Sequence, residues 1–79
     1  MSIETIINTW DPIELFPHSP PDEYSVEIQK IALAKEQTDD AIVLGNNIYQ
    51  IFIDSFGREI FQKPLSECVT IAQEIIYIS

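Results

Sequence analysis

The 79-residue chain has one cysteine, two glycines, and no lysine or arginine before Lys30. The single cysteine excludes an internal disulfide, and one histidine without a Cys-x-x-Cys pair is not the pattern of a structural zinc site. Gly45 and Gly57 lie too far apart to form a glycine-rich phosphate loop. No apolar run approaches the roughly 18 residues of a membrane span, and the start, Met-Ser-Ile-Glu, does not resemble a secretory signal. We expect a cytoplasmic protein without a metal or other cofactor.

What the chain has in excess is negative charge, and this charge is unevenly distributed. Residues 1–29 contain six acidic residues and no Lys or Arg, whereas residues 30–79 contain seven acidic and four basic ones, for a net charge of −9. Such a charge repels nucleic acid and anionic membranes and steers cationic molecules toward the protein. We therefore expect no binding to nucleic acid or membrane, and a protein partner with a basic surface.

The length and composition predict one small globular domain spanning residues 1–79. With 46% hydrophobic and 22% charged residues, the chain is too apolar for a disordered acidic tail. Its fifteen isoleucines supply most of the apolar mass. A core of this size leaves a net stability of about 3–5 kcal/mol.

Four amphipathic stretches predict an all-α fold, a compact bundle of four helices with a proline-rich link between the first and the second. The first has apolar residues at i, i+3, i+4 and i+7, after the candidate N-cap Ser2: Ile3, Ile6, Ile7 and Trp10. The second face comprises Tyr24, Ile28, Ile31, Ala32 and Lys35, the last through its aliphatic stem. The third comprises Ala41, Leu44, Ile48, Ile51, Phe52 and Phe56. The fourth, beginning near Pro64, comprises Leu65, Cys68, Val69, Ala72, Ile75 and Ile76.

Capping patterns mark the boundaries of these helices. Asp11-Pro12-Ile13-Glu14 has the pattern of a capping box and predicts one short helical turn with Asp11 as N-cap. Ser19-Pro20-Pro21-Asp22 predicts the start of the second main helix in the same way. Thr38-Asp39-Asp40 supplies a cap and two first-turn acids for the third helix, and Gly57 its end.

Residues 41–53 also allow a second interpretation. Residues 41–44 and 48–53 could be two β-strands about the glycine-containing turn 45–47. The β-branched isoleucines favour strands locally. However, residues 48–53 do not alternate between apolar and polar, whereas the helical stripe is uninterrupted. We therefore predict a helix here and keep the hairpin as the alternative.

Several short elements together resemble a known family. In order, they are Trp10-Asp11-Pro12, Asp22-Glu23-Tyr24 with Glu27-Ile28, Asp39-Asp40, Ile48-Tyr49-Gln50 with Ser55-Phe56, and Cys68 with Ile71-Ala72 and Ile75-Ile76. They resemble the YugE-like family of small bacterial helical proteins, a domain of unknown function, over roughly residues 10–76. The resemblance implies a compact four-helix fold, with no established activity and no catalytic residues. This chain departs from the family in a longer proline-rich link and a short N-terminus, which bear on the position of its first helix.

Four residues are candidates for chemistry, and each has a structural explanation. Glu23 and Glu27 lie one helical turn apart with His18 nearby, but hydrolytic zinc sites usually contain more than one histidine. We expect His18 to lie exposed in a loop, without the motifs of a catalytic triad. Cys68 falls on the inward face of the last helix, where a buried, unreactive thiol is common. We therefore predict that the protein is not an enzyme.

The leading functional hypothesis is an acidic protein-binding module. Its concrete form is an immunity-type inhibitor that covers the basic surface of a cationic toxin or nuclease. The predicted partner-binding residues are four steering carboxylates and two possible aromatic anchors: Glu14, Asp22, Glu23 and Glu27, with Trp10 and Tyr24. A tryptophan beside a proline-rich turn can instead fix that turn to the core, and the carboxylates can be a plain solvated surface.

The alternative hypothesis is a self-associating structural or regulatory domain, a homodimer. It rests on apolar residues outside the inward stripes, because surplus apolar surface on a short chain is typical of an oligomer contact: Ile13, Leu33, Ile53, Ile60 and Ile78. An enzyme, as a third possibility, would need a convergent polar site.

Overall fold

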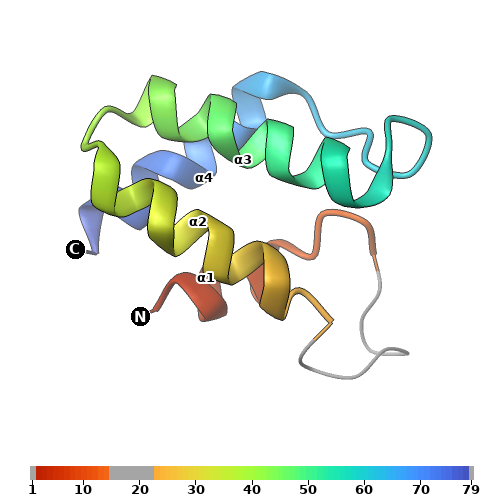
Figure 1. Cartoon of the computed structure of the whole chain (residues 1–79), viewed down its shortest axis with the longest axis horizontal. Helices are drawn as coiled ribbons and strands as arrows, with labels where there is room; N and C mark the ends of the chain where they lie inside the picture. Colours follow the sequence, from red (N-terminus) through yellow and green to blue (C-terminus); the bar gives the residue numbers. More distant parts are fainter. Residues whose placement is uncertain (1, 15–22, 79) are drawn as a thin grey trace.

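The computed structural model of the chain is a bundle of four α-helices (Figure 1). It describes residues 2–14 and 23–78, and no strand occurs in these two ranges. The helices are α1 (Ile3–Trp10), α2 (Ser25–Gln37), α3 (Ala41–Phe56) and α4 (Leu65–Tyr77). The all-α prediction is confirmed, and the hairpin alternative for residues 41–53 is wrong, because these residues lie within one continuous helix.

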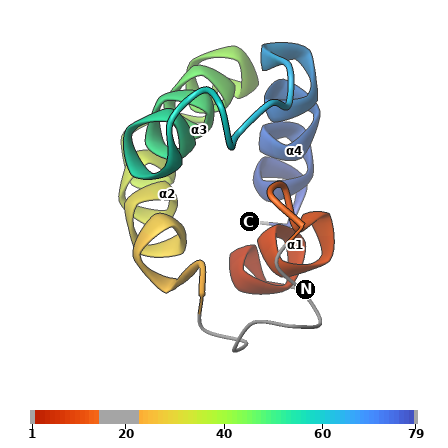
Figure 2. The same cartoon turned by 90° about the vertical axis from the view of Figure 1, so that its right-hand side faces the viewer.

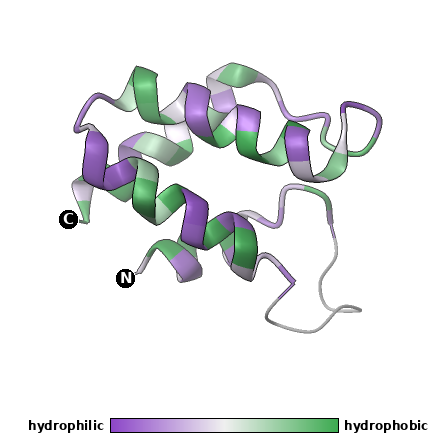
Figure 3. Ribbon diagram, viewed as in Figure 1, coloured by the Kyte–Doolittle hydropathy of each residue, from purple (hydrophilic) through white to green (hydrophobic). Residues whose placement is uncertain are grey.

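The helices surround a single interior. Figure 2 shows α2 and α3 on one side of it and α4 and α1 on the other. The most extensive helix pair is α3 with α4, followed by α2 with α3, while α1 packs less extensively against both α2 and α4. Apolar and polar residues alternate along α3, as an amphipathic helix requires (Figure 3), whereas α2 also exposes the apolar Val26 and Leu33.

The predicted N-cap Ser2 and the predicted helix end at Gly57 are confirmed, whereas the start of α3 is shifted: Asp40 is its N-cap, and neither Asp39 nor Asp40 lies in its first turn. The Ser2 hydroxyl accepts a hydrogen bond from the Thr5 backbone N–H at 3.1 Å, and the Asp40 carboxylate accepts one from the Ile42 N–H at 2.8 Å. Both bonds satisfy backbone donors that have no partner within the helix. Gly57 follows α3 with φ at 82°, a conformation that other residues rarely adopt.

The predicted N-cap role of Asp11 is wrong. Asp11 instead ends α1 in a left-handed conformation with φ at 45°, and residues 12–14 form a turn and no helix. The Asp11 carboxylate accepts a hydrogen bond from the Tyr24 hydroxyl at 2.6 Å, so it ties the end of α1 to the start of α2. The predicted helix start at residues 19–22 lies outside the described residues, and α2 begins at Ser25 without a side-chain cap.

Aromatic rings form the centre of the core. Phe52 stacks on Phe61 with ring centroids 5.1 Å apart and on Phe56 at 5.9 Å. Trp10 and Tyr24 meet Phe52 edge-on at 5.7 and 5.9 Å. These five residues, here called the ring cluster, join α1, α2, α3 and the loop before α4. Aliphatic residues of all four helices are also buried: Ile6, Ile7, Ile31, Leu44, Ile48, Ile71, Ala72 and Ile75.

The closest approach of α3 to α4 depends on Gly45. A Cβ atom at this position would lie 2.7 Å from the Val69 Cα and 2.6 Å from its Cγ2. Since one of these atoms is backbone, the two helices would have to move apart. We expect Gly45→Ala to lower the free energy of unfolding by about 1–3 kcal/mol, despite the roughly 1 kcal/mol gain in helix propensity.

Urea unfolding followed by circular dichroism measures this effect. Asn46→Ala, at an exposed position of the same helix, is the control for helix propensity. A Gly45→Ala variant as stable as Asn46→Ala would contradict the tight α3–α4 contact.

Candidate protein-binding surface

Two of the six predicted partner-binding residues are buried. Tyr24 is 0% exposed and Glu27 is 6% exposed. The Glu27 carboxylate accepts a hydrogen bond from the Ser55 hydroxyl at 3.0 Å, which joins α2 to α3. Neither side chain can contact a partner in this fold, so these two assignments are wrong. The helical spacing indicated this, because Glu27 lies three residues after Tyr24 and four before the buried Ile31, on the same face.

Trp10 fixes the end of α1 to the core. Its ring is half-buried and lies edge-on to Phe52 and Phe61. The indole Nε1–H donates a hydrogen bond to the Glu67 carboxylate at 2.6 Å, and Lys63 forms an ion pair with the same carboxylate at 3.9 Å. Trp10 is therefore packed against the core, as its structural interpretation predicted, and most of the proline-rich turn beside it lies outside the described residues.

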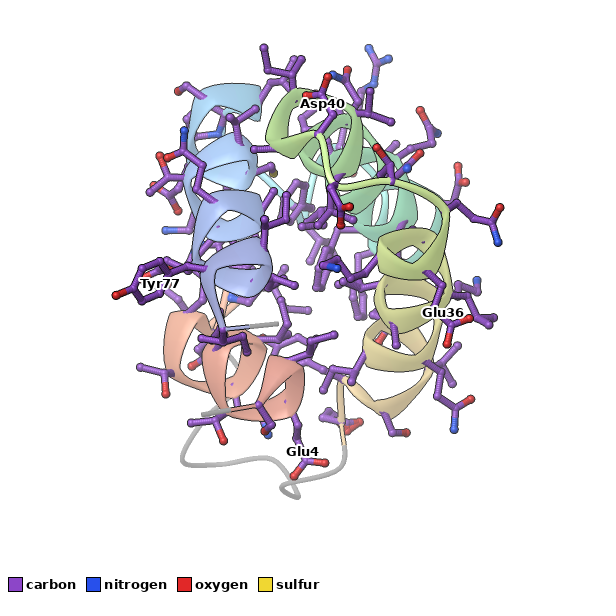
Figure 4. The ribbon with its side chains drawn as sticks, turned by 90° about the vertical axis from the view of Figure 1, so that its left-hand side faces the viewer. Glu4, Glu36, Asp40 and Tyr77 are labelled. Atoms are coloured by element: carbon purple, nitrogen blue, oxygen red, sulfur yellow. The ribbon has the colours of Figure 1, made fainter. Side chains whose placement is uncertain are left out.

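The remaining predicted residues are Glu14, Glu23 and Asp22. Glu14 and Glu23 are exposed, and Asp22 lies outside the described residues. The acidic side chains do not gather at one end of the bundle, since Glu4, Glu36 and Asp40 point outward at well-separated places (Figure 4). In the described part of the chain, the exposed acidic residues are Glu4, Glu14, Glu23, Glu36, Asp39, Asp40, Asp54, Glu59 and Glu74.

Two of the four basic residues are neutralised locally. Lys35 forms an ion pair with Asp39 at 3.3 Å, and Lys63 forms the ion pair with Glu67. Lys30 and Arg58 have no ion-pair partner among the described residues. In residues 2–14 and 23–78, the negative charge is therefore spread around the bundle and is not confined to the N-terminal half.

A groove lies between α1 and α4. It consists of a smaller hollow of about 190 Å³ and a larger one of about 500 Å³, which share Ile6 and Glu74 in their walls. The smaller hollow is lined by Ile6, Thr9, Trp10, Ile71 and Glu74. The larger is lined by Ile6, Thr70, Gln73, Glu74, Tyr77 and Ile78. These residues together are here called the α1–α4 groove.

The α1–α4 groove combines an apolar floor with one carboxylate. Ile6, Ile71 and the half-buried Ile78 provide apolar surface, and Glu74 stands where the two hollows meet. Tyr77, 90% exposed, projects outward from α4 close to α1 (Figure 4). The lining contains no lysine or arginine. Sequence reasoning missed this groove, because it depends on two helices that are far apart along the chain.

The Cys68 thiol is buried in the core. Burial raises its pKa from 9.0 to about 12, and the adjacent Glu67 carboxylate adds to this effect. The reactive thiolate is therefore scarce at neutral pH. The described residues contain no group of three or more His, Cys, Asp or Glu side chains that could hold a metal ion.

We expect Cys68 to react with a thiol reagent at pH 8 at least about 100-fold more slowly in the folded protein than in denaturant, because a domain stable by about 3–5 kcal/mol rarely exposes its core. Absorbance of the released thiol chromophore, with and without guanidinium chloride, measures both rates. Equal rates would show that the thiol is accessible in the native fold.

Comparisons with known proteins give a family but no activity. The family model described as a domain of unknown function, DUF1871, matches residues 2–79. No curated protein and no solved structure matches the chain. None of the helices in residues 2–14 and 23–78 has both the length and the apolar character needed to cross a membrane.

Proposed function

The chain belongs to the DUF1871 family, a domain of unknown function, and we propose that it is an acidic protein-binding module that docks on a partner with a basic surface. It acts by binding and not by catalysis. The observation that carries this proposal is the charge of the surface: exposed carboxylates on all four helices and their connections, against four basic residues of which two are ion-paired.

The distribution of these charges determines how they act. Because the carboxylates surround the bundle, they attract a cationic protein from every direction, and such steering raises association rates by roughly 10- to 1,000-fold. Exposed charges of this kind contribute more to the association rate and to the choice of partner than to the final affinity. The contact itself then needs a more apolar surface.

The concrete form of the proposal is an immunity-type inhibitor in the bacterial cytoplasm. A small protein of net charge −9 that covers the basic surface of a toxin or nuclease would block its access to nucleic acid. The family resemblance to YugE-like proteins and the free, buried Cys68 are compatible with a bacterial protein in a reducing compartment. A gene for a large toxin beside the gene for this chain would support this form.

Self-association is the alternative. It is favoured by large apolar side chains that the bundle leaves exposed: Val26, Leu33, Ile42, Val43, Ile60, Leu65 and Tyr77. The mutual repulsion of two chains of charge −9 opposes it. Light scattering at micromolar concentration distinguishes these hypotheses, because a strict monomer rules out the homodimer.

A series of charge variants tests the proposal. Glu14 and Glu23 are exposed, so replacing both with Gln or both with Lys changes the surface charge without disturbing the core. The partner is first purified from the source cells with the tagged chain at low salt. We expect a basic protein whose association slows progressively from wild type to the Gln pair to the Lys pair. An acidic partner, or one that all three variants bind at the same rate, would overturn the proposal.

A further inference from the structure

The α1–α4 groove has the features of a docking site for one kind of partner segment. We propose that it binds a basic amphipathic helix of the partner protein, with aliphatic side chains in the two hollows and a lysine or arginine on Glu74. This inference rests on the proposed function and adds the place and the chemistry of the contact.

The dimensions of the groove fit a short helical segment. Its α4 wall extends from Thr70 to Ile78, which corresponds to about 12 Å at the helical rise of about 1.5 Å per residue. That length accommodates two turns of a helix lying along α4. Side chains three or four residues apart on such a helix lie on one face, so two of them can enter the two hollows together.

The chemistry of the groove selects an apolar segment with a cation. Ile6 and Ile78 offer apolar surface, and Tyr77 is an exposed aromatic ring of the kind enriched in binding hot spots. Glu74 is exposed, and no ion pair involves its carboxylate among the described residues. On the partner helix, a lysine or arginine between two aliphatic side chains would form an ion pair with the Glu74 carboxylate where the two hollows join.

Net charge also disfavours two other occupants of the α1–α4 groove, a second copy of the chain and an anionic membrane. A second copy of the chain brings a net charge of −9 to the same site. Two of its four basic residues, Lys35 and Lys63, are already ion-paired. An anionic membrane is repelled for the same reason. A basic segment of another protein is the occupant that this groove attracts.

The experiment uses the full chain labelled with ¹⁵N and a synthetic amphipathic peptide of leucine and lysine, five helical turns or about 18 residues long. A peptide with the same leucine positions but glutamate in place of lysine is the matched control. We expect amide shifts that saturate with the Leu–Lys peptide and concentrate at Ile6, Thr70, Gln73 and Tyr77, and at least tenfold weaker binding of the Leu–Glu peptide.

Substitutions locate the contact. Glu74→Lys should weaken binding of the Leu–Lys peptide about tenfold, since it replaces the attraction at the junction with repulsion. Glu36→Lys is the matched control, because it changes the charge equally at an exposed position of α2. Tyr77→Ala, which removes an exposed ring without changing charge, should weaken binding severalfold and is the second variant in case Glu74→Lys disturbs the fold.

Three results would overturn the inference. These are shifts that concentrate on the exposed apolar residues of α2, equal weakening by Glu74→Lys and Glu36→Lys, and a dimer in which the second copy causes the groove shifts. If the charge variants at Glu14 and Glu23 still slow association with the natural partner, the proposed function stands and only the groove assignment falls. If they do not, the function itself is wrong, whatever the peptide does.

Discussion

Phe52→Ala is expected to leave the chain largely unfolded at 25 °C. Truncation of a fully buried phenylalanine costs about 3–5 kcal/mol, which is comparable with the whole stability expected for a domain of this size, about 3–5 kcal/mol. The cost should be high within that range, because Phe52 is 0% exposed and lies against the rings of Trp10, Tyr24, Phe56 and Phe61. Because those rings belong to different elements of the fold, they cannot all move to fill the cavity that the missing phenylalanine ring would leave.

Far-ultraviolet circular dichroism and urea unfolding measure this loss. Ile60→Ala is the matched control, since Ile60 is a large apolar residue that is 57% exposed, and we expect a change within about 0.5 kcal/mol. A Phe52→Ala variant with the urea midpoint of Ile60→Ala would show that the ring cluster is not the centre of the core.

Glu27→Lys is expected to abolish folding, whereas Glu23→Lys leaves it unchanged. The two carboxylates are one helical turn apart, yet Glu23 is exposed and Glu27 is 6% exposed. A lysine at position 27 would bury an ammonium group beside the Ser55 hydroxyl without a carboxylate partner, at a cost of about 3–5 kcal/mol. Most of the stability of the domain would be lost.

The same unfolding measurement applies, with Glu27→Gln as a third variant. Glutamine can still accept the hydrogen bond from Ser55 and should cost about 1 kcal/mol. If Glu27→Lys unfolds at the same urea concentration as Glu23→Lys, Glu27 is a surface residue. Its predicted role as a steering charge would then hold.

The helices could be predicted from the sequence because their signals are local. The N-caps Ser2 and Asp40 and the terminating Gly57 each act within one turn of the chain, and the apolar stripes follow the 3.6-residue period. Asp11 was mispredicted because its local pattern competes with a tertiary partner. The Tyr24 hydroxyl, thirteen residues away, donates a hydrogen bond to the Asp11 carboxylate, which an N-cap would instead use to accept a bond from a backbone N–H.

The proposed binding surface could be predicted only in part. Its chemical character, a net charge of −9, follows from composition, but the place of each charge follows from the packing of the helices. Glu27 was assigned to the surface by residue type although its helical phase places it on the buried face. The α1–α4 groove brings Ile6 beside Glu74, and no short-range pattern connects residues so far apart.

We propose that the negative field of this bundle attracts a cationic protein. The most direct test is the dissociation constant of the purified natural complex, measured by calorimetry at about 50 mM and about 200 mM sodium chloride, over which the Debye length shortens from roughly 14 to 7 Å. We expect the dissociation constant to be about tenfold or more higher at the higher salt concentration. A dissociation constant that is the same at both concentrations would contradict the proposal.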